Sequence, residues 1–153
     1  MDPKNSPNIL IIDANIIIAV CSKEPTAIKI VSALGKYAED DCEFFAPNVI
    51  VAEVLYILCQ KMNIGLLQPQ AYEDAIENFR DQMKTIQTLP DAQFIQRAKE
   101  IQKSYGCSRS ADSIYISLAE ELAKTRTAEL FTLDRGMVNQ AAKNAPTVTV
   151  KVL

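Results

Sequence analysis

The sequence contains no histidine, and only four of its 153 residues are glycine. Without histidine, Ser-His-Asp and Cys-His nucleophile systems are excluded, together with every metal site that has a histidine ligand. No GxGxxG or GxxxxGK[ST] motif occurs, so no glycine-rich phosphate loop is expected. Chemistry would have to come from carboxylates, hydroxyls and amides, and these ligands suit Mg²⁺ or Mn²⁺.

Cysteine is also scarce, and its spacing is uninformative. The four cysteines, Cys21, Cys42, Cys59 and Cys107, form no CxxC pair. This pattern supports neither a zinc site nor a disulfide framework. We expect reduced and mostly buried cysteine side chains.

Long hydrophobic runs are absent as well. The apolar runs are far shorter than the roughly 20 residues that cross a bilayer, so no membrane association is expected. The first residues, MDPKNSPN, lack the basic start and apolar core of a signal peptide, which favours a cytoplasmic location. The formal charge of −3 gives no overall attraction to nucleic acid. Local basic side chains or bound divalent ions can still make one cleft positive.

Apolar and charged residues make up 48% and 23% of the chain, which is ordinary for a globular protein, and the length predicts one domain over residues 1–153. Ile9 to Ile12 is an apolar run typical of a strand buried on both faces at the centre of a parallel sheet. Strands and helices alternate along the rest of the chain, which predicts an α/β fold: a three-layer α/β/α sandwich around a mostly parallel sheet of four or five strands. Further strands are expected at 42–46, 84–89, 130–133 and 147–153. The helix expected over 49–62 is apolar nearly all round, which predicts burial.

Four acidic residues lie in apolar surroundings, where a charge is costly. Asp13 follows the first strand, and ligands of open α/β sheets bind beyond the carboxyl ends of the strands. Glu53 lies in VIVAEVLYIL, Asp112 opens the helix DSIYISLAEEL, and Asp134 ends the strand-like ELFTLD. Carboxylates that converge need a cation to offset their repulsion, so the four suggest a shared site.

Each acid also has a purely structural interpretation. Asp13 and Asp134 would cap the helices that follow them. Glu53 would pair with a distant Arg or Lys, because its helical neighbours are apolar. Asp112 would be favoured in a first helical turn by the helix dipole.

The ordered motifs resemble those of PIN-domain ribonucleases. The motifs are the hydrophobic strand followed by DAN, the acid in PNVIVAEVLYIL, RSADSIYISLAEEL and LFTLDRGM. Within that family the chain is most similar to the VapC toxins, which are partners of VapB antitoxins, and the resemblance covers essentially the whole chain. It implies a metal-dependent endoribonuclease that uses Mg²⁺ or Mn²⁺, and it implies a cognate antitoxin protein and a homodimer.

The resemblance assigns Asp13, Glu53, Asp112 and Asp134 as the catalytic, metal-binding acids. Asp13 would be the central ligand, Asp112 and Asp134 would complete the metal site, and Glu53 would bind the metal or orient a water. Supporting polar positions fall on Asn15 and Thr132. As candidate contacts to RNA phosphates we name Arg109 and Arg135, which equally well relieve acidic repulsion.

Two other functional classes remain open at this level. A receiver-like signalling domain also uses a strand-end Asp with Mg²⁺, but it needs a nearby acidic pair, and the first strand here carries only one acid. A non-catalytic α/β interaction module is the other alternative. Phosphoacceptor labelling identifies the first class, and an RNA pool left unchanged in Mn²⁺ indicates the second.

Overall fold

The strand β1 (Ile9–Ile12) lies at the centre of the sheet in a computed structural model that describes residues 6–107 and 110–153. In this part of the chain five strands pair in the order β3-β2-β1-β4-β5, and every pairing is parallel. The other strands are β2 (Glu43–Pro47), β3 (Ile86–Leu89), β4 (Ala128–Thr132) and β5 (Thr149–Val152). The predicted parallel α/β sandwich is therefore confirmed.

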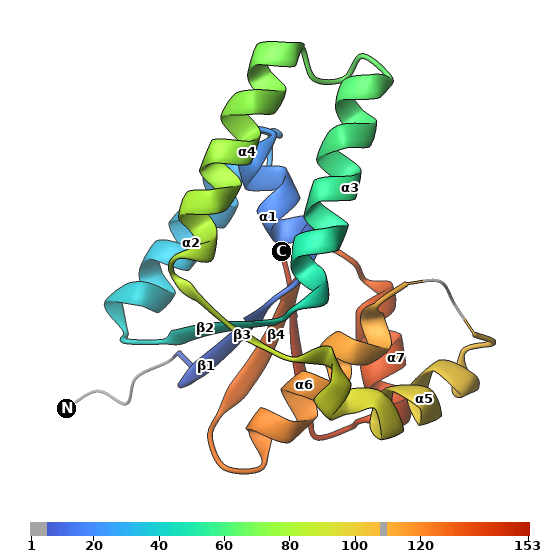
Figure 1. The fold of residues 1–153 in the computed structure, drawn as a ribbon. Helices are drawn as coiled ribbons and strands as arrows, with labels where there is room; N and C mark the ends of the chain where they lie inside the picture. The colour runs from blue at the N-terminus through green and yellow to red at the C-terminus, as the bar shows by residue number, and fades with distance from the viewer. Residues whose placement is uncertain (1–5, 108–109) are drawn as a thin grey trace.

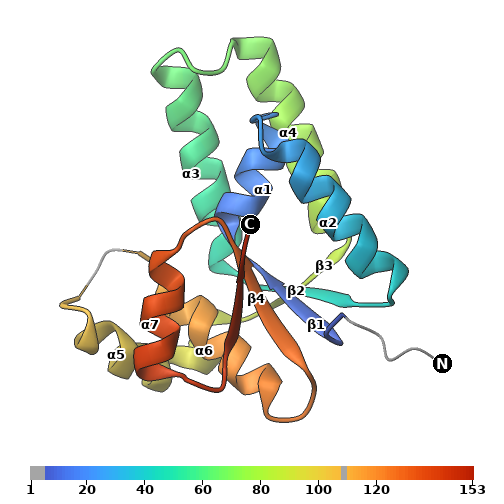
Figure 2. The same cartoon turned by 180° about the vertical axis from the view of Figure 1, so that it is seen from behind.

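Helices cover both faces of this sheet (Figures 1 and 2). One side carries α1 (Ala14–Cys21), α2 (Ala27–Glu39), α3 (Val49–Asn63) and α4 (Pro69–Met83). The other carries the short 3-10 helix η1 (Asp91–Phe94), α5 (Ile95–Ser104), α6 (Asp112–Ala123) and α7 (Gly136–Asn144). Figure 1 shows α3 and α4 as two long helices that extend away from the sheet. No helix in the described ranges is long and apolar enough to cross a membrane.

The register of the central strands explains why the chain folds around β1. Ile11 pairs with Phe45 of β2 on one side and with Leu130 of β4 on the other. All four residues of β1 are at most 1% exposed, as expected for a strand covered on both faces. The carboxyl ends of β1 and β4 therefore lie side by side, and the chain leaves them at Asp13 and Leu133.

The expectation that the helix over 49–62 is buried was wrong. In α3 the residues Ile50, Val54 and Leu58 are buried, but Tyr56 is 65% exposed and Leu55 is 42% exposed. The helix packs against α1 and α4 along one side only. A helix that is apolar all round is buried only where neighbouring elements cover it, and the sequence of the helix does not determine how many there are.

The expectation for cysteine holds only in part. Cys21 and Cys42 are buried, whereas Cys59 and Cys107 are exposed, and all four are free thiols. Burial raises the pKa of Cys21 to about 12 and that of Cys42 to about 11. These two buried thiols are core side chains that stay protonated at neutral pH.

Candidate functional site

The structure brings all four predicted acids to one cavity of about 390 Å³ beyond the carboxyl ends of β1 and β4. They arrive from different elements: Asp13 follows β1, Glu53 is on α3, Asp112 is the first residue of α6, and Asp134 follows β4. The cavity is lined by Asp13, Ala14, Asn15, Ile18, Glu24, Glu53, Ile57, Lys61, Asp112, Leu133 and Asp134. Four acids that are far apart in the sequence thus line one cavity.

Asp13 is the most deeply buried of the four, with 6% of its surface exposed. Burial raises its pKa to about 7; the hydroxyl of Thr132 opposes this shift, and the carboxylates of Asp112 and Glu53 add to it. Thr132 Oγ1 donates to Asp13 Oδ2 at 2.7 Å. Asp13 occupies the N-cap position of α1, but its side chain makes no capping hydrogen bond. Asp13 lines the cavity, and the backbone N–H of Ala14 at the start of α1 also lowers its pKa.

Glu53 is held by a neutral partner. Tyr115 Oη, from α6, donates to Glu53 Oε1 at 2.8 Å. Burial raises the pKa of Glu53, the Tyr115 bond lowers it, and the charge of Asp112 raises it further. The ion pairs formed within the described ranges do not include Glu53. The pairing with Arg or Lys that a structural role requires is thus not seen there.

Asp112 has a similar environment. Gln140 Nε2, on α7, donates to Asp112 Oδ2 at 2.8 Å. Burial raises the pKa of Asp112, the Gln140 bond lowers it, and the charge of Asp134 raises it. Because Asp112 also opens α6, the helix dipole favours it there as well.

Asp134 is the exposed member of the group. The backbone N–H of Gly136 donates to Asp134 Oδ1 at 2.8 Å, so this carboxylate does bind the first residue of α7. A Cβ added at Gly136 would lie 3.0 Å from the same oxygen, so a larger side chain would press on the carboxylate. Asp134 therefore combines a structural contact with a place at the rim of the cavity.

Thr132 and Asn15 connect these acids, in the supporting positions that the sequence predicts. Besides donating to Asp13, Thr132 Oγ1 accepts from Asn15 Nδ2 at 3.3 Å and from the backbone N–H of Asp134 at 3.0 Å. Asn15 Oδ1 in turn accepts from the N–H of Leu133 at 3.2 Å. A hydroxyl has one proton and two acceptor positions, so these contacts use the full capacity of Thr132.

The two predicted arginines are not placed at the cavity. Arg109 lies outside the described residues, and Arg135 is exposed at the N-cap position of α7 without lining the cavity. Sequence reasoning missed Tyr115 and Gln140, which hold two of the acids. Tyr115 follows Asp112 by one helical turn, which was the only local signal for it.

A divalent cation fits the donor set of this cavity. Among the described residues no three His, Cys, Asp or Glu side chains form a ready-made metal cage. Mg²⁺ does not require such a cage, because it usually keeps several waters and binds one or two carboxylates together with substrate phosphates. The buried Asp13, with Asp112 and Glu53 as charged neighbours, provides hard oxygen ligands that lack a cationic partner in the described contacts.

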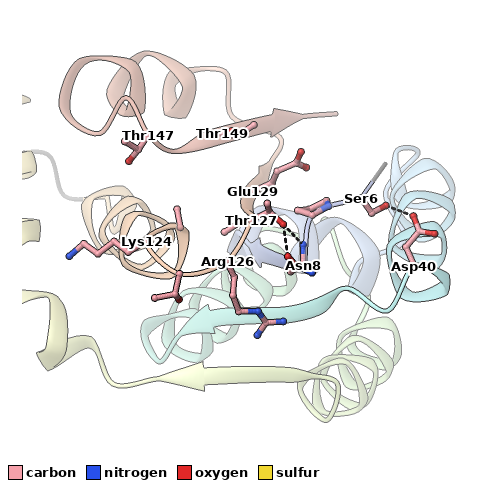
Figure 3. Close-up of a pocket in the computed structure, with 13 residues that line it drawn as sticks. Ser6, Asn8, Asp40, Lys124, Arg126, Thr127, Glu129, Thr147 and Thr149 are labelled. Atoms are coloured by element: carbon pink, nitrogen blue, oxygen red, sulfur yellow. Dashed lines mark hydrogen bonds between the residues drawn. The ribbon is translucent and has the colours of Figure 1, made fainter. Parts of the chain in front are cut away.

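A larger cavity, of about 950 Å³, lies at the opposite ends of the strands (Figure 3). Its polar groups bind one another: Ser6 donates to Asp40, and Thr127 Oγ1 donates to Asn8 Oδ1 at 2.7 Å. None of the four predicted acids lines it. Cavity size is therefore a poorer guide here than the convergence of buried carboxylates.

Comparison with known proteins identifies the type of domain. The family model of the PIN domain matches residues 10–143. A chain in the crystal structure of VapBC2 from Rickettsia felis, bound to a DNA fragment from their promoter, is similar with a TM-score of 0.66 and 15% identity, over 95% of this chain and 98% of that one. PAE2754 from Pyrobaculum aerophilum is similar with a TM-score of 0.56 and 13% identity, over 92% and 82%. No curated protein matches the sequence.

The raised pKa of Asp13 predicts how Asp13→Asn changes stability with pH. In EDTA the native wild-type protein holds a proton on Asp13 up to about pH 7, while the unfolded chain loses it near the ordinary aspartate pKa of 3.8. Between these values rising pH lowers the wild-type free energy of unfolding. Through this window we expect the free energy of unfolding of Asp13→Asn to rise relative to that of the wild type, by about a few kcal/mol in total. Urea unfolding at a series of pH values measures this difference.

Asp81→Asn is the control, because it removes the same charge from an exposed side chain that pairs with Lys84 at 3.0 Å. It should show no comparable gain. An Asp13→Asn variant less stable than the wild type at pH 8 in EDTA would contradict the assignment of Asp13 as a buried acid without a cation.

Proposed function

The chain belongs to the PIN domain family, whose members are generally nucleases, and from this we propose that it is an Mg²⁺- or Mn²⁺-dependent endoribonuclease. The observation that carries the proposal is the convergence of Asp13, Glu53, Asp112 and Asp134 on one cavity, with Asp13 buried. We also propose that residues 1–153 act as one domain, because helices from both halves of the chain cover the same sheet.

In this mechanism the chain supplies oriented carboxylates. Asp13 would be the central metal ligand, with Asp112 and Asp134 beside it. A bound divalent ion would lower the pKa of water and stabilise the charge that develops on the phosphate. Thr132 and Gln140 fix the carboxylates of Asp13 and Asp112 through hydrogen bonds of 2.7 and 2.8 Å.

Glu53 would act next to this centre. Its Oε1 accepts from Tyr115, so a metal or the attacking water would be held through its other oxygen. With its pKa raised by burial, Glu53 accepts a proton more readily than an exposed glutamate does, which suits a group that orients water. The Tyr115 bond orients this side chain, which lines the cavity.

The central test is RNA cleavage by Asp112→Asn. We expect the wild type to cut RNA in Mg²⁺ or Mn²⁺ and to stop in EDTA, and we expect the variant to cleave at least about a hundred-fold more slowly, because a charged ligand is lost. The melting temperature of the variant in EDTA should be unchanged or higher, and Mn²⁺ should raise it less than in the wild type.

Asp81→Asn serves again as the matched control and should cleave like the wild type. Sequencing the new RNA ends would define the cleavage site. Cleavage that persists in excess EDTA would contradict the metal mechanism. A wild type that leaves the RNA pool unchanged in Mn²⁺ would instead favour a non-catalytic interaction module.

We further propose that the protein is the toxin of a toxin-antitoxin pair. The similarity to a chain of the VapBC2 complex supports an antitoxin partner. Such a partner would place an Arg or Lys side chain among the four acids and so offset their charge. Induced expression of the wild type without a partner should arrest growth, and Asp112→Asn at the same protein level should not. Equal growth with both proteins would remove the toxin role.

A homodimer is the third part of the proposal, and α3 offers the surface for it. From Val51 to Cys59 its exposed side carries no charged residue; the exposed residues there are Val51, Ala52, Leu55, Tyr56 and Cys59. A second copy can present the same uncharged patch across a twofold axis, which suits self-association better than recognition of a charged partner.

Leu55→Glu tests this surface. We expect a dimeric wild type and a monomeric variant by light scattering, because a buried, unpaired carboxylate opposes association. Ile28→Glu is the control, since Ile28 is 81% exposed and belongs to a different helix, α2. A wild type that stays monomeric at all concentrations, or a Leu55→Glu dimer, would exclude this interface.

A further inference from the structure

The acidic cavity also contains a lysine. Lys61 is the single cationic side chain among the described residues that line it. Its Nζ lies 2.7 Å from Glu24 Oε1, with the two side chains 22% and 34% exposed. This is a half-buried ion pair at the edge of a site whose other carboxylates lack such a partner in the described contacts.

The fold places this lysine away from the four acids but on the same side of α3 as Glu53. Glu53, Ile57 and Lys61 follow one another at intervals of four residues, so all three lie on neighbouring parts of one helix surface, and all three line the cavity. The eight residues from Glu53 to Lys61 correspond to a rise of about 12 Å along the helix. Lys61 therefore lies about two helical turns along α3 from Glu53.

The cavity also has apolar lining residues. Ile18, Ile57 and Leu133 line the cavity along with the charged groups. The sugar and base of a nucleotide are less polar than its phosphates. A nucleotide therefore suits an apolar surface that has a metal-suited site at one end and a cation at the other.

Resting on the proposed function, we propose that Lys61 is a substrate-binding residue that holds the phosphate of a nucleotide next to the one cleaved. The nucleotide between them lies against Ile18, Ile57 and Leu133. The ligand class is therefore single-stranded RNA that spans both ends of the cavity.

Glu24, the partner of Lys61, is held in place by backbone hydrogen bonds. It lies in the connection between α1 and α2, where its backbone N–H donates to Ala19 O at 3.0 Å and its carbonyl accepts from Ala27 N at 2.9 Å. An ammonium group has three protons, and the Glu24 bond uses one of them. Two protons remain for phosphate oxygens.

The alternative explanation is that the ion pair only stabilises the packing of this connection against α3. In that case removing either partner breaks the same contact, so Lys61→Met and Glu24→Gln should have the same effects. In phosphate binding the partners act in opposite directions, because Lys61 attracts RNA and Glu24 repels it.

The experiment measures cleavage kinetics on a short single-stranded RNA, and binding of the same fluorescently labelled RNA to the Asp112→Asn protein in Mn²⁺. We expect Lys61→Met to raise KM roughly ten-fold with kcat nearly unchanged, because a uniform binding contact is lost. The slope of log affinity against log salt should shrink by about 0.7, which is the value for one phosphate contact to a single strand. Glu24→Gln should leave KM unchanged or lower it, and Lys61→Arg should restore most of the affinity.

Lys84→Met is the matched control, since Lys84 also forms an ion pair but does not line the cavity. Its KM and salt slope should equal those of the wild type. Equal losses of RNA affinity for Lys61→Met and Glu24→Gln would overturn the inference and leave the nuclease proposal standing. A Lys61→Met protein with wild-type KM and salt slope would do the same.

A wild type that binds RNA through Lys61 without cutting it would overturn only the nuclease proposal. Absence of both binding and cutting would overturn both.

Discussion

Burial of the Asp13 carboxylate at the end of the central strand is the constraint on which the site depends. At 6% exposure, with Asp112 and Glu53 as charged neighbours, the ionised form is unfavourable, and its pKa rises to about 7. The position follows from the fold, because β1 is enclosed on both faces and its end faces the cavity. A carboxylate in this place is stabilised either by a proton or by a cation.

In the described part of the chain, the side chains that donate hydrogen bonds to Asp13, Glu53 and Asp112 are neutral, and this preserves the negative charge of the cavity. Thr132, Tyr115 and Gln140 donate hydrogen bonds to Asp13, Glu53 and Asp112, which orients the carboxylates without cancelling their charge. An Arg or Lys in these places would occupy the oxygens that a metal needs. Lys61, the one lysine among the described residues that line the cavity, pairs with Glu24 instead. Orientation and charge are thus controlled by different residues.

The sequence allowed prediction of features that depend on local pattern, and it missed those that depend on contacts between distant segments. The buried strand Ile9–Ile12 and the alternation of strands and helices followed from local hydrophobicity, and the acids were visible as charges in apolar runs. The hydrogen bond from Tyr115 to Glu53 joins residues 62 positions apart, so no periodicity could indicate it. The exposure of Tyr56 was missed for the same reason, because it depends on which neighbours α3 happens to have.

These properties connect metal binding to the stability of the fold. A metal ligand must be deprotonated, so a divalent ion competes with the proton that Asp13 otherwise holds below about pH 7. Above that pH the metal-free protein carries an ionised, buried carboxylate, and its stability is lowered relative to the protonated form. An ion bound to the native state offsets this loss, as does any ligand that the unfolded chain does not bind. The buried charge therefore lowers the stability of the metal-free protein, and the proposed cation would offset that loss.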